Sequence, residues 1–168
     1  LATADDTAVS RSAIFQADGQ ASVESLVSLC EQALAGMQFD SFGKYVVLVG
    51  HGSHHSNNAQ RAGLNCGACG GQSGALSARV LTRLLNDGEI RKHLVDRGVQ
   101  IPSDTQFYSA LHETVTDQVV WLSDSVPDQV KCLFSNATEA LTTSTNGSAK
   151  QLKKQPIIMC CFSGELAD

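Results

Sequence analysis

The chain has 168 residues, 42% of them hydrophobic, and a formal net charge of −5. This length is sufficient for one domain with a substantial apolar core. Lys and Arg are scattered along the sequence, which argues against nucleic-acid binding because that function needs a clustered basic face. No apolar run approaches the ~18 residues that a membrane-spanning helix needs.

The two ends of the chain carry little pattern. Residues 1–20 are polar, which predicts an irregular lead-in. The first residues lack the basic and apolar regions of a signal peptide, and the chain does not begin with Met, so we expect a processed chain or one cut from a longer protein. Near the other end, Lys150, Lys153 and Lys154 form a basic cluster, which is typical of a solvated helix end or loop; a lipid-headgroup patch is the alternative.

The hydrophobic pattern predicts helices and strands in alternation. A helix is expected over 22–35, ending at Gly36, and the continuous apolar run over 45–49 is typical of a strand buried on both faces of a parallel sheet. The further elements expected are helices over 74–86, 89–96 and 127–141, the start of a strand over 99–101, and strands over 118–122 and 156–162. On the helix over 74–86 one side is apolar: Leu76, Val80, Leu81, Leu84 and Leu85. Such alternation indicates an α/β fold with a parallel sheet.

The domain organisation predicted from this pattern has three parts. An irregular lead-in over 1–20 precedes one α/β domain over 21–141. The remaining residues, 142–168, are expected to form a low-complexity linker over 142–149 and a terminal strand. There is no internal repeat.

The six cysteines do not read as a disulfide framework, although their number is even. Cys30 falls on the apolar stripe of the first helix, and Cys132 adjoins Leu133 and Phe134. Free cysteine behaves as a small apolar residue in such positions. This usage fits a reducing, cytoplasmic setting.

The segment over 50–73 is the most informative part of the chain. Loops longer than ~12–15 residues in a compact domain are usually functional or disordered. His51 stands between two glycines at the end of the buried strand, and Cys66 and Cys69 follow on the same loop. Chemistry in open α/β sheets gathers outside the carboxyl ends of strands, and imidazole with thiolate is a donor set that zinc selects. The sequence therefore predicts half of a zinc site, with a satisfied polar histidine as the alternative.

Two features of this loop have alternative interpretations. Cys66-Gly-Ala-Cys69 could be a thioredoxin-like redox motif, but its glycines replace the usual aromatic and proline neighbours. Gly70 and Gly71 precede the start of a helix, where exposed N–H groups attract anions and Arg79 could add charge. The alternative there is a plain tight turn with Ser73 as the N-cap.

Other polar residues are expected to support the loop. His54 and His55 are interpreted as part of a solvated loop, and Asn57-Asn58 as residues that hydrogen-bond the loop into shape. The segment 112–117, just before a predicted strand, groups titratable and hydroxyl residues. Its expected role is a capping and loop-bracing network, with catalysis as the alternative.

Several motifs together resemble the DabA family. They are Val-Leu-Val-Gly-His-Gly-Ser, Asn-Asn, Cys-Gly-Ala-Cys-Gly-Gly-Gln-Ser-Gly, Ala-Arg-Val-Leu, Leu-Leu-Asn, Ile-Pro-x-Asp-Thr and Ala-Leu-His-x-Thr-x-Thr-Asp. The likeness runs from about Gly36 to Leu122. It implies a core similar to β-carbonic anhydrases, so that 21–141 would be the zinc-site domain and the C-terminal half of that core.

The resemblance implies a Zn²⁺ site of two cysteines, one histidine and one aspartate. His51 and Cys66 correspond to two of these ligands, and Gly70 and Gly71 would line the pocket of a small anion beside the metal. The other two ligands belong to an upstream Cys-x-Asp-x-Arg motif that this chain lacks; neither Cys160-Cys161 nor Asp96-Arg97 supplies it. They would come from the remaining part of the same protein or from a second chain.

The implied function is part of a zinc-dependent CO2-hydrating subunit in an energy-coupled system that accumulates inorganic carbon as bicarbonate. The implied partner is a membrane subunit related to proton- or sodium-conducting antiporters, and the implied location is cytoplasmic, peripheral to the inner membrane. Whether this chain alone is an enzyme stays open. The alternatives are a non-catalytic scaffold that binds the membrane partner and a thiol redox module using Cys66 and Cys69.

Overall fold

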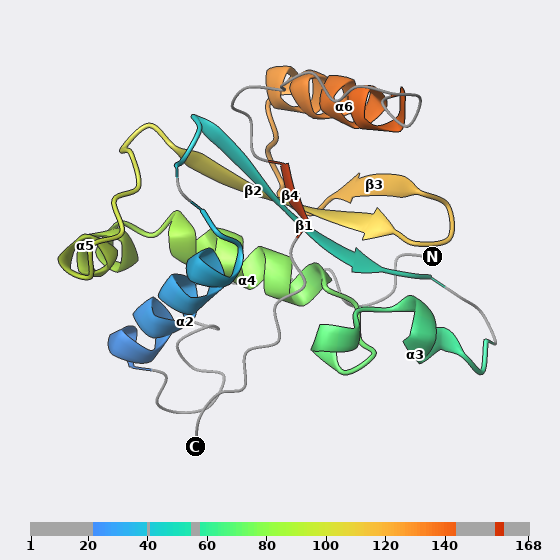
Figure 1. The fold of residues 1–168 in the computed structure, drawn as a ribbon, viewed down its shortest axis with the longest axis horizontal. Helices are drawn as coiled ribbons and strands as arrows, with labels where there is room; N and C mark the ends of the chain where they lie inside the picture. The colour runs from blue at the N-terminus through green and yellow to red at the C-terminus, as the bar shows by residue number, and fades with distance from the viewer. Residues whose placement is uncertain (1–21, 40, 55–57, 144–156, 160–168) are drawn as a thin grey trace.

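The computed structural model describes residues 22–39, 41–54, 58–143 and 157–159. The elements in chain order are α2 (Val23–Gly36), β1 (Tyr45–Gly52), α3 (Arg61–Leu64), the 3-10 helix η1 (Gly67–Cys69), α4 (Ala75–Leu85), α5 (Gly88–Asp96), β2 (Gln106–Glu113), β3 (Gln118–Trp121), α6 (Asp128–Thr143) and β4 (Ile157–Met159). Helices α2, α4 and α5 lie on one face of the sheet and α6 on the other (Figure 1). The described residues therefore form three layers, with the sheet between the helices on its two faces.

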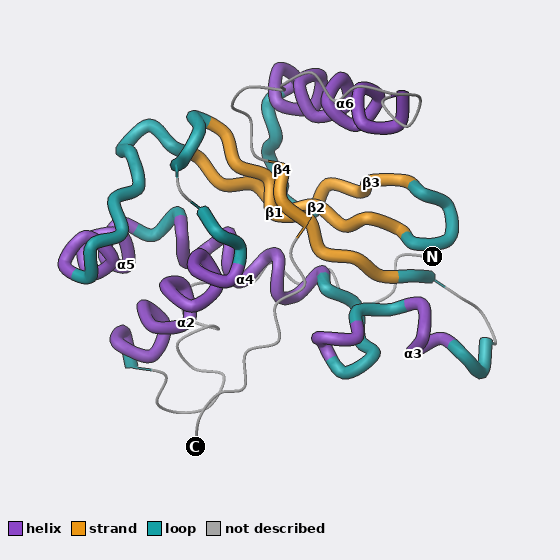
Figure 2. Tube along the Cα trace, in the orientation of Figure 1, coloured by secondary structure: helices purple, strands orange, loops and turns teal. Residues whose placement is uncertain are grey.

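The sheet has four strands in the order β3-β2-β1-β4. Strand β1 pairs in parallel with both β2 and β4, which confirms a parallel sheet for these three strands. Strand β3 pairs antiparallel with β2, because only residues 114–117 connect them and a parallel connection needs a crossover of a dozen or more residues. Figure 2 shows this short hairpin beside the longer helical crossover that joins β1 to β2.

Strand β1 lies at the centre of the core. Its residues from 46 to 50 are all buried, as the continuous apolar run predicts. Val46 and Leu48 pack in the cluster beneath α2, α4 and α5, whereas Val47 and Val49 pack in a second cluster beneath α6. The sheet is thus buried on both faces at this strand, and the predicted α/β fold is confirmed.

Several expected elements are confirmed and others are wrong. The helices expected over 22–35, 74–86, 89–96 and 127–141 correspond to α2, α4, α5 and α6, and the strands over 45–49 and 118–122 correspond to β1 and β3. The strand expected from 99–101 is wrong: Val99 donates its N–H to Leu94 O, which closes α5, and Pro102 follows. The strand of this region is β2, which ends with His112 and Glu113, the first two residues of the segment 112–117. That segment precedes β3, as expected. Leu76 does not share the buried side of α4, since it is 63% exposed.

Some expectations concern residues outside the described part of the chain. They are the lead-in over 1–20, most of the linker over 142–149, Lys150, Lys153, Lys154 and the ends of the strand over 156–162. The three-part division of the chain stays a prediction. Strand β4 falls within the expected terminal strand, and α6 extends to Thr143.

The outer edge of β2 is closed by side chains where β3 does not reach. Asn86, at the end of α4, donates to Phe107 O at 2.8 Å and accepts from Phe107 N at 3.0 Å. Ser123 Oγ accepts from Ser109 N at 2.8 Å. These bonds replace those of a neighbouring strand, so the buried backbone is satisfied and the edge cannot take another strand there.

Strand β1 and the turn before α4 approach each other closely at two glycines. A Cβ at Gly50 would lie 2.4 Å from Gly74 O, and one at Gly74 would lie 3.0 Å from His51 N. The N–H of Gly74 donates to His51 O at 2.9 Å. Only glycine fits at this contact, which fixes the start of α4 against the end of β1.

We predict that Asn86→Ala lowers the free energy of unfolding by about 1–3 kcal/mol, because it leaves the Phe107 N–H and C=O without partners. The measurement is urea unfolding followed by circular dichroism. Gln100→Ala, at an exposed position, is the matched control and is expected to be neutral within ~0.5 kcal/mol. Equal stability of both variants would contradict the edge-closing role.

We also predict that Gly50→Ala is severely destabilising, by about 3 kcal/mol or more, since its methyl group would overlap backbone that cannot move aside. The control is Gly63→Ala in α3, where an added Cβ meets nothing within 4 Å. Thermal unfolding of the two variants is the measurement. A Gly50→Ala protein as stable as Gly63→Ala would show that the contact is not tight.

Candidate functional site

His51 lies at the carboxyl end of β1, next to its last residue, and is half-buried. In the parallel pairing of β1 and β2 it stands in register with His112. Alternation along β1 places His51 on the same face as Val47 and Val49, beneath α6, and His112 shares that face. The two histidines are therefore neighbours at the carboxyl ends of β1 and β2, where the sites of α/β proteins usually form.

Cys66 belongs to a compact loop that folds back on itself. It forms a β-bridge with Gln72, its N–H donates to Gln72 O at 3.0 Å, and its side chain is fully buried. Two residues after Gln72, Gly74 donates to His51 O. The hydrogen bonds that connect Cys66 with His51 thus run through the backbone. For His51 and Cys66 to bind one metal ion, the Cys66 thiol must extend past the end of β1 to the His51 ring.

Cys69 lies one 3-10 turn after Cys66, with its N–H donating to Cys66 O at 3.1 Å. Burial raises the pKa of the Cys69 thiol, and the neighbouring Cys66 thiol raises it further, whereas the hydrogen bond with Ser77 lowers it. Both cysteines are free. Two neighbouring thiols are available for metal binding or for oxidation.

The glycines after Cys69 have a backbone reason to be glycine. Gly70 has φ +62 and Gly71 has φ +77, and a Cβ at Gly71 would lie 2.9 Å from Ala62 Cβ. These positive angles close the turn that leads into α4. The N-cap of α4 is Gly74 rather than Ser73, although Ser73 Oγ accepts from Ala75 N at 3.3 Å. An anion-binding role for Gly70 and Gly71 stays a prediction.

A buried carboxylate, Glu113, organises the start of the loop. His54 N donates to Glu113 Oε1 at 2.9 Å, and His54 Nδ1 lies 2.7 Å from Glu113 Oε2. His54 is an exposed loop residue, as expected, and these two bonds hold it against Glu113. Glu113 belongs to the segment 112–117, and these bonds agree with the loop-bracing role expected of that segment. The pairing Gly52↔Glu113 places it at the same sheet end as His51.

Further bonds fasten the loop to the sheet. Ser53 N donates to Asn65 Oδ1 at 2.8 Å, and the Thr114 hydroxyl donates to Gly52 O at 2.7 Å and Leu64 O at 3.0 Å. Asn58 Oδ1 accepts from Gln60 N, which agrees with its expected loop-shaping role. Thr114 provides the loop bracing expected of 112–117.

His112 makes a second acid–base pair at this edge. Its Nε2 lies 2.5 Å from Asp117 Oδ1. Asp117 has φ 57, the left-handed conformation of a tight turn, and its N–H donates to Glu113 O. The pair closes the hairpin between β2 and β3 and orients the His112 ring beside His51.

The described residues hold no group of three or more His, Cys, Asp or Glu side chains able to bind a metal. His55, Asn57, Cys160 and Cys161 lie outside the described part of the chain. Within that part, no helix combines the length and apolar character needed to cross a membrane.

Comparison with known proteins gives a consistent result. The family model described as "Probable inorganic carbon transporter subunit DabA" matches residues 2–155. A relative with that description from Idiomarina loihiensis is 63% identical over 153 residues, which is 91% of this chain and 20% of the relative. One from Marinomonas sp. is 55% identical over 91 residues, 54% of this chain and 11% of the relative.

A third relative, described as "Probable inorganic carbon transporter subunit DabA2" from Halothiobacillus neapolitanus, is 43% identical over 124 residues, 73% of this chain and 15% of the relative. The chain thus spans a fifth or less of the length of these relatives. No solved structure matches it, so the likeness to carbonic anhydrases stays a prediction. The family match covers nearly the whole chain, and the chain therefore belongs to the DabA family of inorganic carbon transporter subunits.

Proposed function

We propose that this chain supplies two ligands, His51 and Cys66, to a zinc site that hydrates CO2 within an inorganic carbon transporter subunit. The observation that supports it most directly is the carboxyl end of β1, where His51 is joined to the Cys66 loop through the Gly74 N–H. The family match supplies the context of inorganic carbon transport.

The donor set fits zinc in kind. Imidazole nitrogen and thiolate sulfur are the ligands that zinc favours, and a tetrahedral site needs four ligands, or three and an open position. His51 and Cys66 would hold the metal from this chain, and the remaining ligands would come from the rest of the same protein or from a second chain. Zinc, when bound, lowers the pKa of a water molecule toward ~7 and so supplies a nucleophile at neutral pH.

The residues around these two ligands hold them in place. Gly50 and Gly74 set the strand end, and the bonds of Glu113 and Asn65 fasten the loop that carries Cys66. Burial of Cys66 excludes water from one side of the site. Such supporting contacts orient ligands before the metal arrives, which raises affinity.

The setting of the whole subunit follows from the same proposal. It would lie on the cytoplasmic side of the inner membrane, peripheral to a proton- or sodium-conducting antiporter-like partner, and bicarbonate would be its product. The alternative is a non-catalytic scaffold that binds this partner. It would apply if no other part of the protein supplied the remaining zinc ligands.

A thiol redox module is a second candidate function. It is favoured by the 3-10 turn that sets Cys69 beside Cys66, whereas the raised pKa of the Cys69 thiol disfavours the thiolate that redox chemistry needs. Cys30 cannot take part, because burial raises its pKa to about 12. This candidate predicts reversible loss of two thiols per chain and no bound zinc.

In a complete subunit containing this sequence, we predict one zinc ion per subunit, lost in His51→Ala and Cys66→Ser but retained in Cys69→Ser. Removing one of four ligands weakens zinc binding by at least about tenfold. The measurement is zinc content by plasma mass spectrometry after dialysis, with thiol titration of the same samples. Zinc retained in Cys66→Ser but lost in Cys69→Ser would reverse the assignment, and reversible two-thiol oxidation without zinc would favour the redox module.

We predict that the 168-residue chain alone, with added zinc, hydrates CO2 no faster than zinc in buffer, because two ligands hold the metal weakly. Stopped-flow hydration with a pH indicator is the measurement, and His51→Ala is the control. Fast hydration that His51→Ala abolishes would mean that the missing ligands are present in this chain or in a second copy of it.

A further inference from the structure

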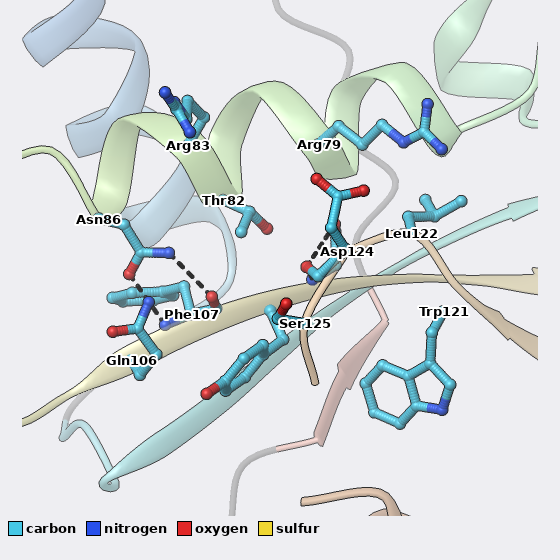
Figure 3. A pocket seen from close by; sticks show the side chains of 13 residues that line it. Arg79, Thr82, Arg83, Asn86, Gln106, Phe107, Trp121, Leu122, Asp124 and Ser125 are labelled. Atoms are coloured by element: carbon cyan, nitrogen blue, oxygen red, sulfur yellow. Dashed lines mark hydrogen bonds between the residues drawn. The ribbon is translucent and has the colours of Figure 1, made fainter. Parts of the chain in front are cut away.

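A cleft of about 760 Å³ lies between α4 and the residues that follow β3 (Figure 3). One stripe of α4 forms the first wall: Arg79, Thr82, Arg83 and Asn86. The segment 121–125 forms the opposite wall, and the first half of β2 lies between them. The cleft is therefore at the amino end of β2, whereas His51 and Glu113 lie at the carboxyl end of the sheet.

Thr82 is the residue that most needs an explanation. Its side chain is 8% exposed, it lines the cleft, and its hydroxyl has no hydrogen-bond partner in the described structure. A buried hydroxyl without a partner costs about 1–3 kcal/mol. In Figure 3 the Thr82 side chain extends from α4 into the space above the sheet. A ligand in the cleft would satisfy it.

The charges of the walls are unequal. Arg79 and Arg83 on α4 are both cationic, and Asp124 on the opposite wall is the anionic residue of the lining, with its carboxylate extending toward α4. Guanidinium groups bind carboxylate and phosphate oxygens with directed hydrogen bonds. The α4 wall thus favours an anionic group, and the Asp124 carboxylate can accept a hydrogen bond from a hydroxyl group elsewhere on the ligand.

An extended peptide is a poor occupant. The edge of β2 in the cleft is already bonded to Asn86 and Ser123, so no strand can add to it. The volume lies within the range of ~300–1,000 Å³ that is typical of small-molecule sites. The lining is rich in hydroxyl, amide and guanidinium groups, which are hydrogen-bond donors to an oxyacid.

We propose that this cleft binds a small organic anion, whose carboxylate or phosphate group contacts Arg83 and the Thr82 hydroxyl while its remainder faces Asp124 and Ser125. This site lies at the opposite end of β2 from the candidate zinc ligands. It stands whether or not the zinc proposal holds.

The test is isothermal titration calorimetry at low ionic strength with three probes: citrate, inorganic phosphate and bicarbonate. We expect saturable one-to-one binding of citrate or phosphate, which separates carboxylate from phosphate recognition, and weaker binding of bicarbonate because it fills less of the cleft. Arg83→Gln is expected to weaken binding about tenfold. Lys92→Gln, which removes the same charge from an exposed position on α5, is the matched control and should bind as the unmodified protein does.

Thr82→Val distinguishes ligand binding from a structural role. The substitution keeps the shape and removes a hydroxyl that no described residue satisfies, so the free energy of unfolding should stay equal or rise. Affinity for the anion should fall at least threefold. A protein that loses stability but keeps its affinity would show that the hydroxyl serves the fold.

The proposal is overturned by no saturable binding of citrate or phosphate, by equal weakening in Arg83→Gln and Lys92→Gln, or by unchanged affinity in Thr82→Val. The titrations are made on the complete subunit as well as on the 168-residue chain. Binding to the short chain alone would overturn it too, because another part of the subunit would then fill the cleft.

Discussion

The contact between Gly50 and Gly74 is the constraint on which the rest of this structure depends. The two backbone segments are in contact there with no room for a Cβ, and the Gly74 N–H donates a hydrogen bond to His51 O. One end of α4 is thereby fixed to the carboxyl end of β1. The intervening loop must start and finish at nearly the same place, which brings Cys66 back toward the strand that carries His51 despite the fourteen residues between them.

Polar contacts hold the described residues of the loop between these fixed points, in addition to the burial of Cys66. Glu113 accepts from the His54 backbone and pairs with its ring, and Thr114 bonds to both Gly52 and Leu64. Glu113 is the last residue of β2, and Thr114 lies in the turn after it. A buried carboxylate is costly unless it is hydrogen-bonded, and here the loop supplies the donors. The order of the loop therefore depends on the pairing of β1 with β2.

The hydrophobic pattern of the sequence predicts the elements with clear periodicity. It does not predict those that depend on tertiary contacts. The run over 46–49 predicts β1, and helical spacing predicts α2, α4, α5 and α6. Strand β2 is missed because Ala110, Leu111 and Glu113 favour helices in isolation, and its pairing on both sides overrides that preference. The positive φ angles of Gly70 and Gly71 agree with the tight turn that the sequence offered as one interpretation, and their anion-binding role stays a prediction. His51 and Cys66 stay predicted zinc ligands, because the described residues contain no group of three or more possible metal ligands that would test the assignment.

Helix α4 connects the two ends of the sheet that matter for function. Its first turn touches His51 through Gly74, and its last turn closes the β2 edge through Asn86. At ~1.5 Å per residue, eleven helical residues span about 16 Å between these contacts. Because the Gly50–Gly74 contact leaves no space for α4 to move toward β1, and the Asn86 bonds hold its other end to Phe107, the stripe bearing Thr82 and Arg83 is kept at a fixed height above β2. The same contact that positions the candidate metal ligand therefore also sets the width of the cleft.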